Sequence, residues 1–147
     1  MIIFLGIPMI TELEMIIRLI FSVGLGSLIG LERELMHKPA GLRTNALVCL
    51  GSCLFTLLSV EYFGADYARI AAGIVSGIGF IGAGIIINSG KEVQGITTAS
   101  TLWAVAAIGI GIGAGAYILC AAATVIALTV LKMKVIEKPM KKAGKRF

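Results

Sequence analysis

Five long apolar stretches, separated by short polar segments, dominate this 147-residue chain. They lie at about 13–31, 44–60, 70–88, 97–113 and 116–133. A helix needs about 17–25 predominantly apolar residues to cross the hydrocarbon core of a bilayer. The pattern therefore predicts an all-α membrane protein, with a bundle of five transmembrane helices in residues 1–131 and a short basic tail at 132–147.

The last two apolar stretches are separated only by the glycine-rich segment 110–115. A single helix over 97–133 would be about 55 Å long, whereas the hydrocarbon core is about 30 Å thick. We therefore expect two helices joined by a tight hairpin.

Composition excludes the ordinary soluble classes. The chain is 58% hydrophobic and 14% charged, whereas soluble domains are about 25% charged. The net charge of +5 is concentrated in the tail, which holds seven of the 13 basic residues: Lys132, Lys134, Lys138, Lys141, Lys142, Lys145 and Arg146. A basic tail after an apolar span indicates topology and contact with anionic lipid, and we expect no nucleic-acid partner.

Basic residues in short loops also predict the orientation in the membrane. One side would carry the tail and four loop residues, namely Arg33, Lys38, Arg43 and Lys91, while the other would carry only Arg18 and Arg69. The N-terminus is therefore expected outside and the C-terminus in the cytoplasm.

The first two spans resemble the next two. Gly24 and Gly77 each begin a Gly-x-Gly in mid-span; Gly41 follows the first after 17 residues and Gly95 follows the second after 18. This indicates a parallel two-helix duplication with its pseudo-axis along the membrane normal. The alternative is chance similarity between glycine-rich apolar segments.

The charged segment 30–45, between spans one and two, is the first candidate site. Thr44 and Asn45, and in the second copy Thr97 and Thr98, stand where helix N-caps stand. Two helix N-termini together with Arg43 would form an anion seat on the cytoplasmic face.

Acidic residues in the same segment offer a cation seat. Glu32 and Glu34 are tentative ligands for Mg²⁺, or partners for Arg33 and Arg43, and a Glu32–Arg43 ion pair is the preferred interpretation. Charged groups that merely anchor the end of a span are the alternative for Glu32 and Arg33. Asn88, beside the second loop, is either a ligand or a helix cap.

Two pairs of opposite charges begin spans one and three. Glu14 and Arg18 are four residues apart and would share a helix face, and Asp66 and Arg69 are three apart. Both pairs are expected on the outer side. A structural ion pair is at least as good an interpretation as a substrate site.

Small residues form two stripes at helical spacing. Ser22, Gly26 and Gly30 form one, and Gly73 and Gly77 form the other. Such stripes let helices pack closely, either within one subunit or between subunits. We expect a homodimer, since the bundle is too small to bury every stripe.

Four segments closely resemble the MgtC/SapB family of bacterial inner-membrane proteins: GLERE at 30–34, PAGLRTNALV at 39–48, RIAAGIVSGIGFIGAG at 69–84 and TTASTLW at 97–103. The resemblance covers about residues 13–131. It implies five spans with the N-terminus outside, a link to magnesium limitation and, in some pathogens, to survival inside host cells. Some family members carry a soluble regulatory domain after the last span, where this sequence has its short basic tail.

Two functions from different classes follow. The resemblance implies a regulatory role in magnesium and ion homeostasis and in membrane energetics, through contacts with another inner-membrane protein. The charged cluster on the cytoplasmic face is expected to sense an ion or anion in that role. The alternative is a small oligomeric transporter or channel for Mg²⁺ or another cation, although a pathway usually needs polar groups at mid-depth. No nucleophile–base pair or other catalytic constellation is evident, so we expect no enzyme and no cofactor.

Overall fold

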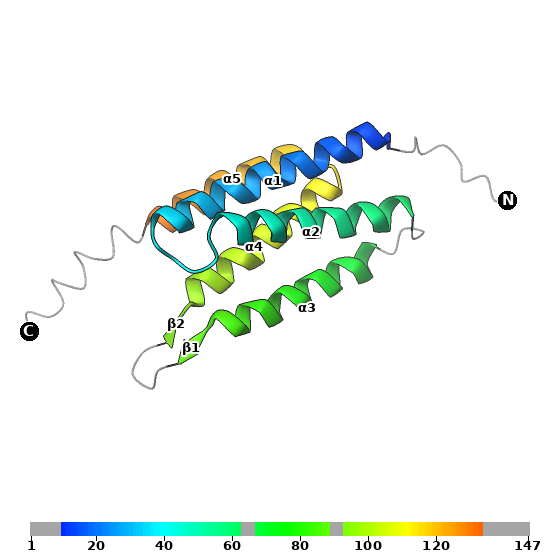
Figure 1. Ribbon diagram of the computed structural model, residues 1–147. Helices are drawn as coiled ribbons and strands as arrows, with labels where there is room; N and C mark the ends of the chain where they lie inside the picture. Colours follow the sequence, from blue (N-terminus) through cyan, green and yellow to red (C-terminus); the bar gives the residue numbers. More distant parts are fainter. Residues whose placement is uncertain (1–9, 63–66, 89–92, 134–147) are drawn as a thin grey trace, which may run out of the picture.

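The computed structural model describes residues 10–62, 67–88 and 93–133. The elements are α1 (Glu12–Leu35), α2 (Leu42–Glu61), α3 (Tyr67–Ile85), β1 (Ile87–Asn88), β2 (Val93–Gln94), α4 (Ile96–Gly113) and α5 (Tyr117–Lys132). The helices run side by side along one long direction (Figure 1). Four of them, α1 to α4, are long and apolar enough to cross a membrane.

The last helix, α5, has 16 residues and would measure about 24 Å, somewhat less than the hydrocarbon core. The predicted hairpin before it is present. Gly115 adopts a left-handed φ of +86°. Ala116 N–H donates to Gly111 O at 2.8 Å and Gly115 N–H to Ile112 O at 2.9 Å, a Schellman motif that ends α4.

The first helix is longer than the apolar pattern indicated. Thr11 caps its start by accepting a hydrogen bond from Glu14 N–H at 3.3 Å, and the helix continues past residue 31 to Leu35. Glu32, Arg33 and Glu34 therefore lie on the last turns of a helix and not in a loop. The apolar pattern predicted an end at residue 31 because it marks only the part of the helix inside the hydrocarbon core, and the helix continues beyond that part.

The third helix ends earlier than predicted. It stops at Ile85, and Asn88 lies instead in a two-residue strand. In this antiparallel ribbon Ile87 pairs with Gln94 and Asn88 with Val93. Gly95 follows with a φ of +90° and leads into α4.

The main core lies where α1, α2 and α4 meet, with α5 packed beside them. Its buried members are Leu25, Ile29, Cys49, Cys53, Leu57, Val105, Ile108, Ile112 and Cys120. The three thiols are free and buried, as expected of cysteines that act as small apolar residues.

The third helix packs mainly against α4. Ile78 forms a smaller buried cluster with Leu102 and Ala106, and Gly82 lies against Ala99. Only 11% of the apolar window of α3 is buried, whereas the corresponding shares for α1, α2 and α4 are 33%, 39% and 50%. The predicted duplication remains a prediction, and α3 is the least buried of the four long helices.

Candidate functional site

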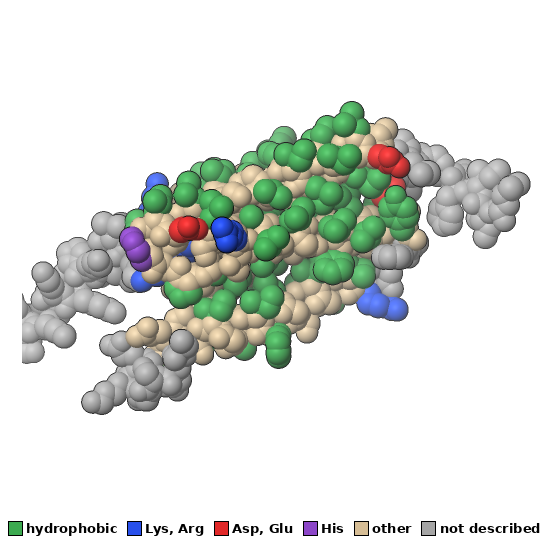
Figure 2. Space-filling model, in the orientation of Figure 1, with side chains coloured by type: hydrophobic (Ala, Val, Ile, Leu, Met, Phe, Trp, Pro, Cys, Tyr) green, Lys and Arg blue, Asp and Glu red, His purple; other side chains and the backbone are tan. Residues whose placement is uncertain are grey.

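Polar side chains gather at both ends of the bundle. The basic end is the one at which Arg33, Lys38, Arg43 and Lys132 lie. Figure 2 shows most of the visible basic side chains, and the histidine, at this end. The opposite end carries Glu14 and Arg18 near the start of α1.

At the basic end, Glu32 pairs with its neighbour in sequence. Arg33 Nε lies 2.5 Å from Glu32 Oε2, and both side chains are buried. The preferred Glu32–Arg43 ion pair is therefore wrong. Because α1 continues through residue 35, Arg33 remains beside Glu32, whereas Arg43 is exposed on the first turn of α2.

Glu34 joins the two helices across the turn. Its Oε2 accepts a hydrogen bond from Leu42 N–H at 2.9 Å, which satisfies one of the donors at the start of α2. A carboxylate is also favoured there by the positive end of the helix dipole. The helix N-terminus expected to hold an external anion already holds a carboxylate of this chain.

The predicted N-caps are displaced. The N-cap of α2 is Gly41 and that of α4 is Gly95, and neither makes a side-chain cap hydrogen bond. Thr44 and Asn45 lie within the first turns of α2, and Thr97 and Thr98 within the first turn of α4. Glycine begins both helices because the entering backbone is close to other atoms: a Cβ on Gly41 would lie 2.8 Å from Glu34 Oε2, and one on Gly95 would lie 2.4 Å from Ile85 O.

Asn45 is fully buried and holds the turn in place. Its Nδ2 donates to Ala40 O at 2.5 Å and to Gly41 O at 2.9 Å. Its Oδ1 has no hydrogen-bond partner in the described part of the chain. Ala40 has a left-handed φ of +57°, so the amide of Asn45 stabilises a turn with an unusual backbone.

The two copies of the proposed anion seat do not join. Thr98 is buried and Thr97 is exposed. Within residues 10–62, 67–88 and 93–133, no hydrogen bond or ion pair links either threonine to Glu32, Arg33 or Arg43. The role of Asn88 as a ligand remains a prediction.

At the opposite end, Arg18 connects three helices. Its Nη2 lies 2.5 Å from Glu14 Oε1, so the pair predicted from their spacing is present. Its Nε donates to Tyr117 Oη at 2.9 Å and its Nη1 to Gly113 O at 2.7 Å. The guanidinium, with 7% of the residue exposed, therefore ties α1 to the α4–α5 hairpin. The companion pair cannot be compared, because Asp66 lies outside the described residues.

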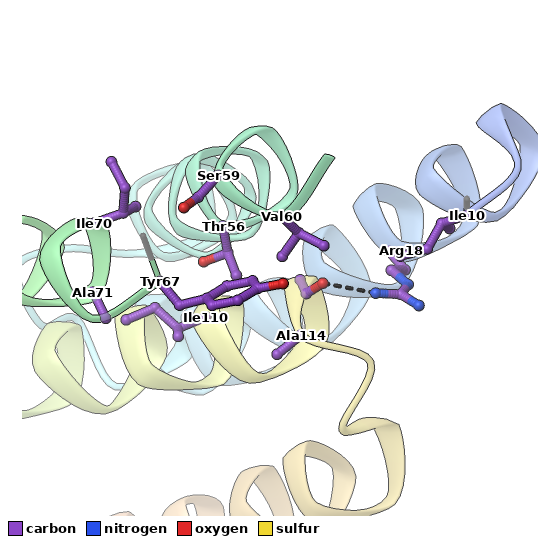
Figure 3. Close-up of a pocket in the computed structure, with 11 residues that line it drawn as sticks. Ile10, Arg18, Thr56, Ser59, Val60, Tyr67, Ile70, Ala71, Ile110 and Ala114 are labelled. Carbon is purple, nitrogen blue, oxygen red and sulfur yellow. Dashed lines mark hydrogen bonds between the residues drawn. The ribbon is translucent and has the colours of Figure 1, made fainter. Parts of the chain in front are cut away.

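A cavity of about 420 Å³ lies next to Arg18. Figure 3 shows Thr56 and Ser59 from α2 and Tyr67 from α3 around it, with the hydrogen bond of Arg18 at one end. Thr56 Oγ1 donates to Ser52 O at 2.8 Å, whereas the buried Ser59 Oγ has no partner among the described residues. Sequence reasoning missed Tyr117 and Ser59; the one signal for Tyr117 is that an aromatic hydroxyl follows the hairpin.

Comparison with known proteins identifies the family. The MgtC family's sequence profile matches residues 19–138. Over 113 residues the chain is 49% identical to Protein MgtC of Salmonella typhimurium. This match covers 77% of the chain and 49% of that protein. Over 87 residues it is 53% identical to Protein MgtC of Brucella abortus, and this match covers 58% of the chain and 37% of that protein. No solved structure matches.

The chain thus belongs to the MgtC family. The matched part spans about half the length of the Salmonella relative and less than half the length of the Brucella relative. Family membership and four helices of membrane-spanning length make it a multi-pass membrane protein.

Proposed function

We propose that this member of the MgtC family is a regulatory protein of the bacterial inner membrane, that it serves magnesium and ion homeostasis, and that it acts by contact with another membrane protein. The resemblance supplies the physiological context. The observation that carries the mode of action is the loose attachment of α3, a helix of spanning length with 11% of its window buried.

The charged groups of the basic end support action by contact better than they support a resident Mg²⁺. Mg²⁺ requires oxygen ligands in near-octahedral geometry. Glu32 faces Arg33, and Glu34 faces the first amide of α2. The described residues contain no group of three or more His, Cys, Asp or Glu side chains that would hold a metal. Glu34 thus serves the junction between α1 and α2, and the charge of Glu32 is balanced by Arg33, so neither carboxylate offers uncompensated charge to a bound Mg²⁺.

The exposed face of α3 supplies a contact surface. Phe80 is 85% exposed in the second half of this helix, and Gly84, one turn further on, has nothing within 4 Å of a Cβ built on it. Small residues beside an aromatic ring allow close approach of a second helix. The partner is another inner-membrane protein that packs on Phe80 and Gly84, beside the groove between α2 and α3. The expected homodimer stays a prediction.

Substitution of Phe80 tests this function. Phe80→Ala removes an apolar side chain from α3 that is 85% exposed. Ile118→Ala is the matched control, because it removes an apolar side chain from α5 that is 88% exposed. In a strain that needs this gene for growth in low magnesium, Phe80→Ala is expected to impair growth at unchanged protein level, whereas Ile118→Ala is not. Equal growth of the two variants would contradict a partner contact on α3.

The cavity beside Arg18 favours a second candidate, a small oligomeric ion transporter. Thr56 and Ser59 line it and extend polar groups from the opposite end into the bundle. Reconstituted liposomes decide between the two functions: cation flux that Ser59→Ala reduces would establish transport. Absence of flux for Mg²⁺, K⁺ and Na⁺ at several pH values would exclude it.

A further inference from the structure

An open groove runs between α2 and α3. Its walls come from residues between Arg43 and Phe55 on α2 and between Arg69 and Ile81 on α3, and it encloses about 670 Å³. Figure 2 shows the surface hollowed between these two helices. The volume lies within the range of about 300–1,000 Å³ typical of sites for single small molecules.

The groove is apolar, and glycines leave part of its lining without side chains. Its walls include Leu47, Ile74 and Ile78. Gly51, Gly73 and Gly77 also line it, and a Cβ on any of them would have no other atom within 4 Å. An apolar groove of this kind is filled in a bilayer by hydrocarbon, because an empty one forfeits dispersion contacts along its whole lining.

One end of the groove carries a positive charge. Arg43 and Thr44 line the groove where α2 begins, at the basic end. Arg43 is exposed, and no carboxylate of the described residues lies within ion-pair distance of it. A guanidinium matches the oxygens of a phosphate with two parallel hydrogen bonds.

The groove is long enough to hold an acyl chain, and it runs from Arg43 in the first turn of α2 to Arg69 in the first turn of α3. Residues 43–55 of α2 rise by about 18 Å, and one leaflet contributes about 15 Å of the hydrocarbon core. We propose that the α2–α3 groove binds one anionic phospholipid, with its phosphate on Arg43 and one acyl chain along Gly51, Gly73 and Gly77. Basic sites between transmembrane helices are known to select such headgroups.

A second copy of the chain is the less suitable occupant. A helix with its side chains is about 10–12 Å wide, much wider than one acyl chain. A helix placed there would also leave the charge of Arg43 without an anion. This inference is independent of the regulatory role, since a lipid site on α2 and α3 is compatible with either proposed function.

Two matched pairs of variants test the site. Arg43→Gln removes the charge at the basic end of the groove, and Lys38→Gln removes an exposed charge from the turn at the same end. Gly77→Leu fills the groove, and Gly24→Leu adds the same side chain at an equally open glycine outside it.

The experiment titrates the purified chain in neutral detergent with phosphatidylglycerol, with phosphatidylcholine of the same acyl chains, and with inorganic phosphate, and follows thermal unfolding. Phosphatidylglycerol is expected to raise the midpoint most. Arg43→Gln should weaken its apparent affinity about fivefold, the effect of one basic residue on an anionic lipid, while Lys38→Gln leaves it unchanged. A phosphatidylglycerol with a photoreactive acyl chain should label α2 and α3, and Gly77→Leu but not Gly24→Leu should abolish that labelling.

Several results would overturn the proposal. Equal responses to the two lipids would remove the headgroup selectivity. Equal losses in Arg43→Gln and Lys38→Gln, or a response to phosphate alone, would indicate attraction to surface charge without a groove. Loss of a chemically cross-linked dimer in Gly77→Leu, in lipid-free detergent, would make the groove a contact between copies.

Discussion

The α1–α2 pair and the α2–α3 pair use glycine in opposite ways. In α1, a Cβ on Gly26 would lie 2.7 Å from Cys49 Cβ, and one on Gly30 would lie 2.6 Å from Leu42 Cα. In α3, a Cβ on Gly73 or Gly77 would have no neighbour within 4 Å. The first stripe closes an interface, and the second leaves a groove open.

The difference shows that a small-residue stripe specifies an interface only with a partner that matches it. Gly26 and Gly30 meet the backbone of α2 beside Gly41, Asn45 and Cys49, which are small or serve the turn. The stripe of α3 faces no such surface, because α3 contacts the bundle mainly by packing its own Ile78 and Gly82 against α4. The open face is therefore left for lipid or for another protein.

The sharpest test of this comparison changes matched glycines in the two halves. Gly26→Leu places a side chain where Cys49 and the carbonyl of Asn45 already lie, and should cost about 1–3 kcal/mol or more of unfolding free energy. Gly79→Leu, at the second glycine of the Gly-x-Gly in α3, meets open space and should be neutral or slightly stabilising. Thermal unfolding in detergent measures both.

Equal destabilisation by the two leucines would contradict the difference in packing. A severe loss in Gly79→Leu alone would indicate that α3 closes against something in the folded protein.

The next largest effect is expected at Arg18, which holds the closed half together at the opposite end. Arg18→Met removes hydrogen bonds to Tyr117 Oη, Gly113 O and Glu14, and should lower stability by about 1.5–3 kcal/mol. Glu14→Gln keeps an acceptor at a partly exposed position and should cost about 1 kcal/mol or less. A ranking with Glu14→Gln as the more damaging change would refute the role of Arg18 as a structural link.

The smallest of these effects is expected at the cap of α2. Glu34→Ala removes the acceptor for Leu42 N–H and should destabilise the chain by about 1 kcal/mol, the usual cost of a lost cap. Lys38→Ala, in the same exposed turn, should change little. Hydrogen exchange gives a local readout: the amide of Leu42 should lose protection in Glu34→Ala only.

Much of this fold follows from sequence. Five helices, the Gly115 hairpin and the Glu14–Arg18 pair come from apolar length, turn chemistry and helical spacing. The ends of helices do not, because polar residues such as Glu32 and Glu34 continue α1 beyond its apolar stretch.

The partners of the charged side chains at the basic end could not be predicted from sequence. Arg43 is the natural partner for Glu32 by charge, but Arg33 is buried beside it on the same helix. Glu34 reaches Leu42 because Gly30 and Gly41 allow the two helices to approach, which depends on tertiary packing. Residues that meet across helices, such as Arg18 and Tyr117, lie 99 positions apart and carry no local signal.

Glu34 serves the α1–α2 junction, Glu32 is paired with Arg33, and we propose that neither carboxylate holds Mg²⁺. Titration of the purified chain with MgCl₂, at constant ionic strength, tests it by thermal unfolding. We predict no rise of the midpoint beyond that given by monovalent salt, in wild type and in Glu34→Gln alike. A saturable rise with Mg²⁺ that disappears in Glu34→Gln, and persists in Glu12→Gln at the opposite end, would contradict the account and make this cluster a metal site.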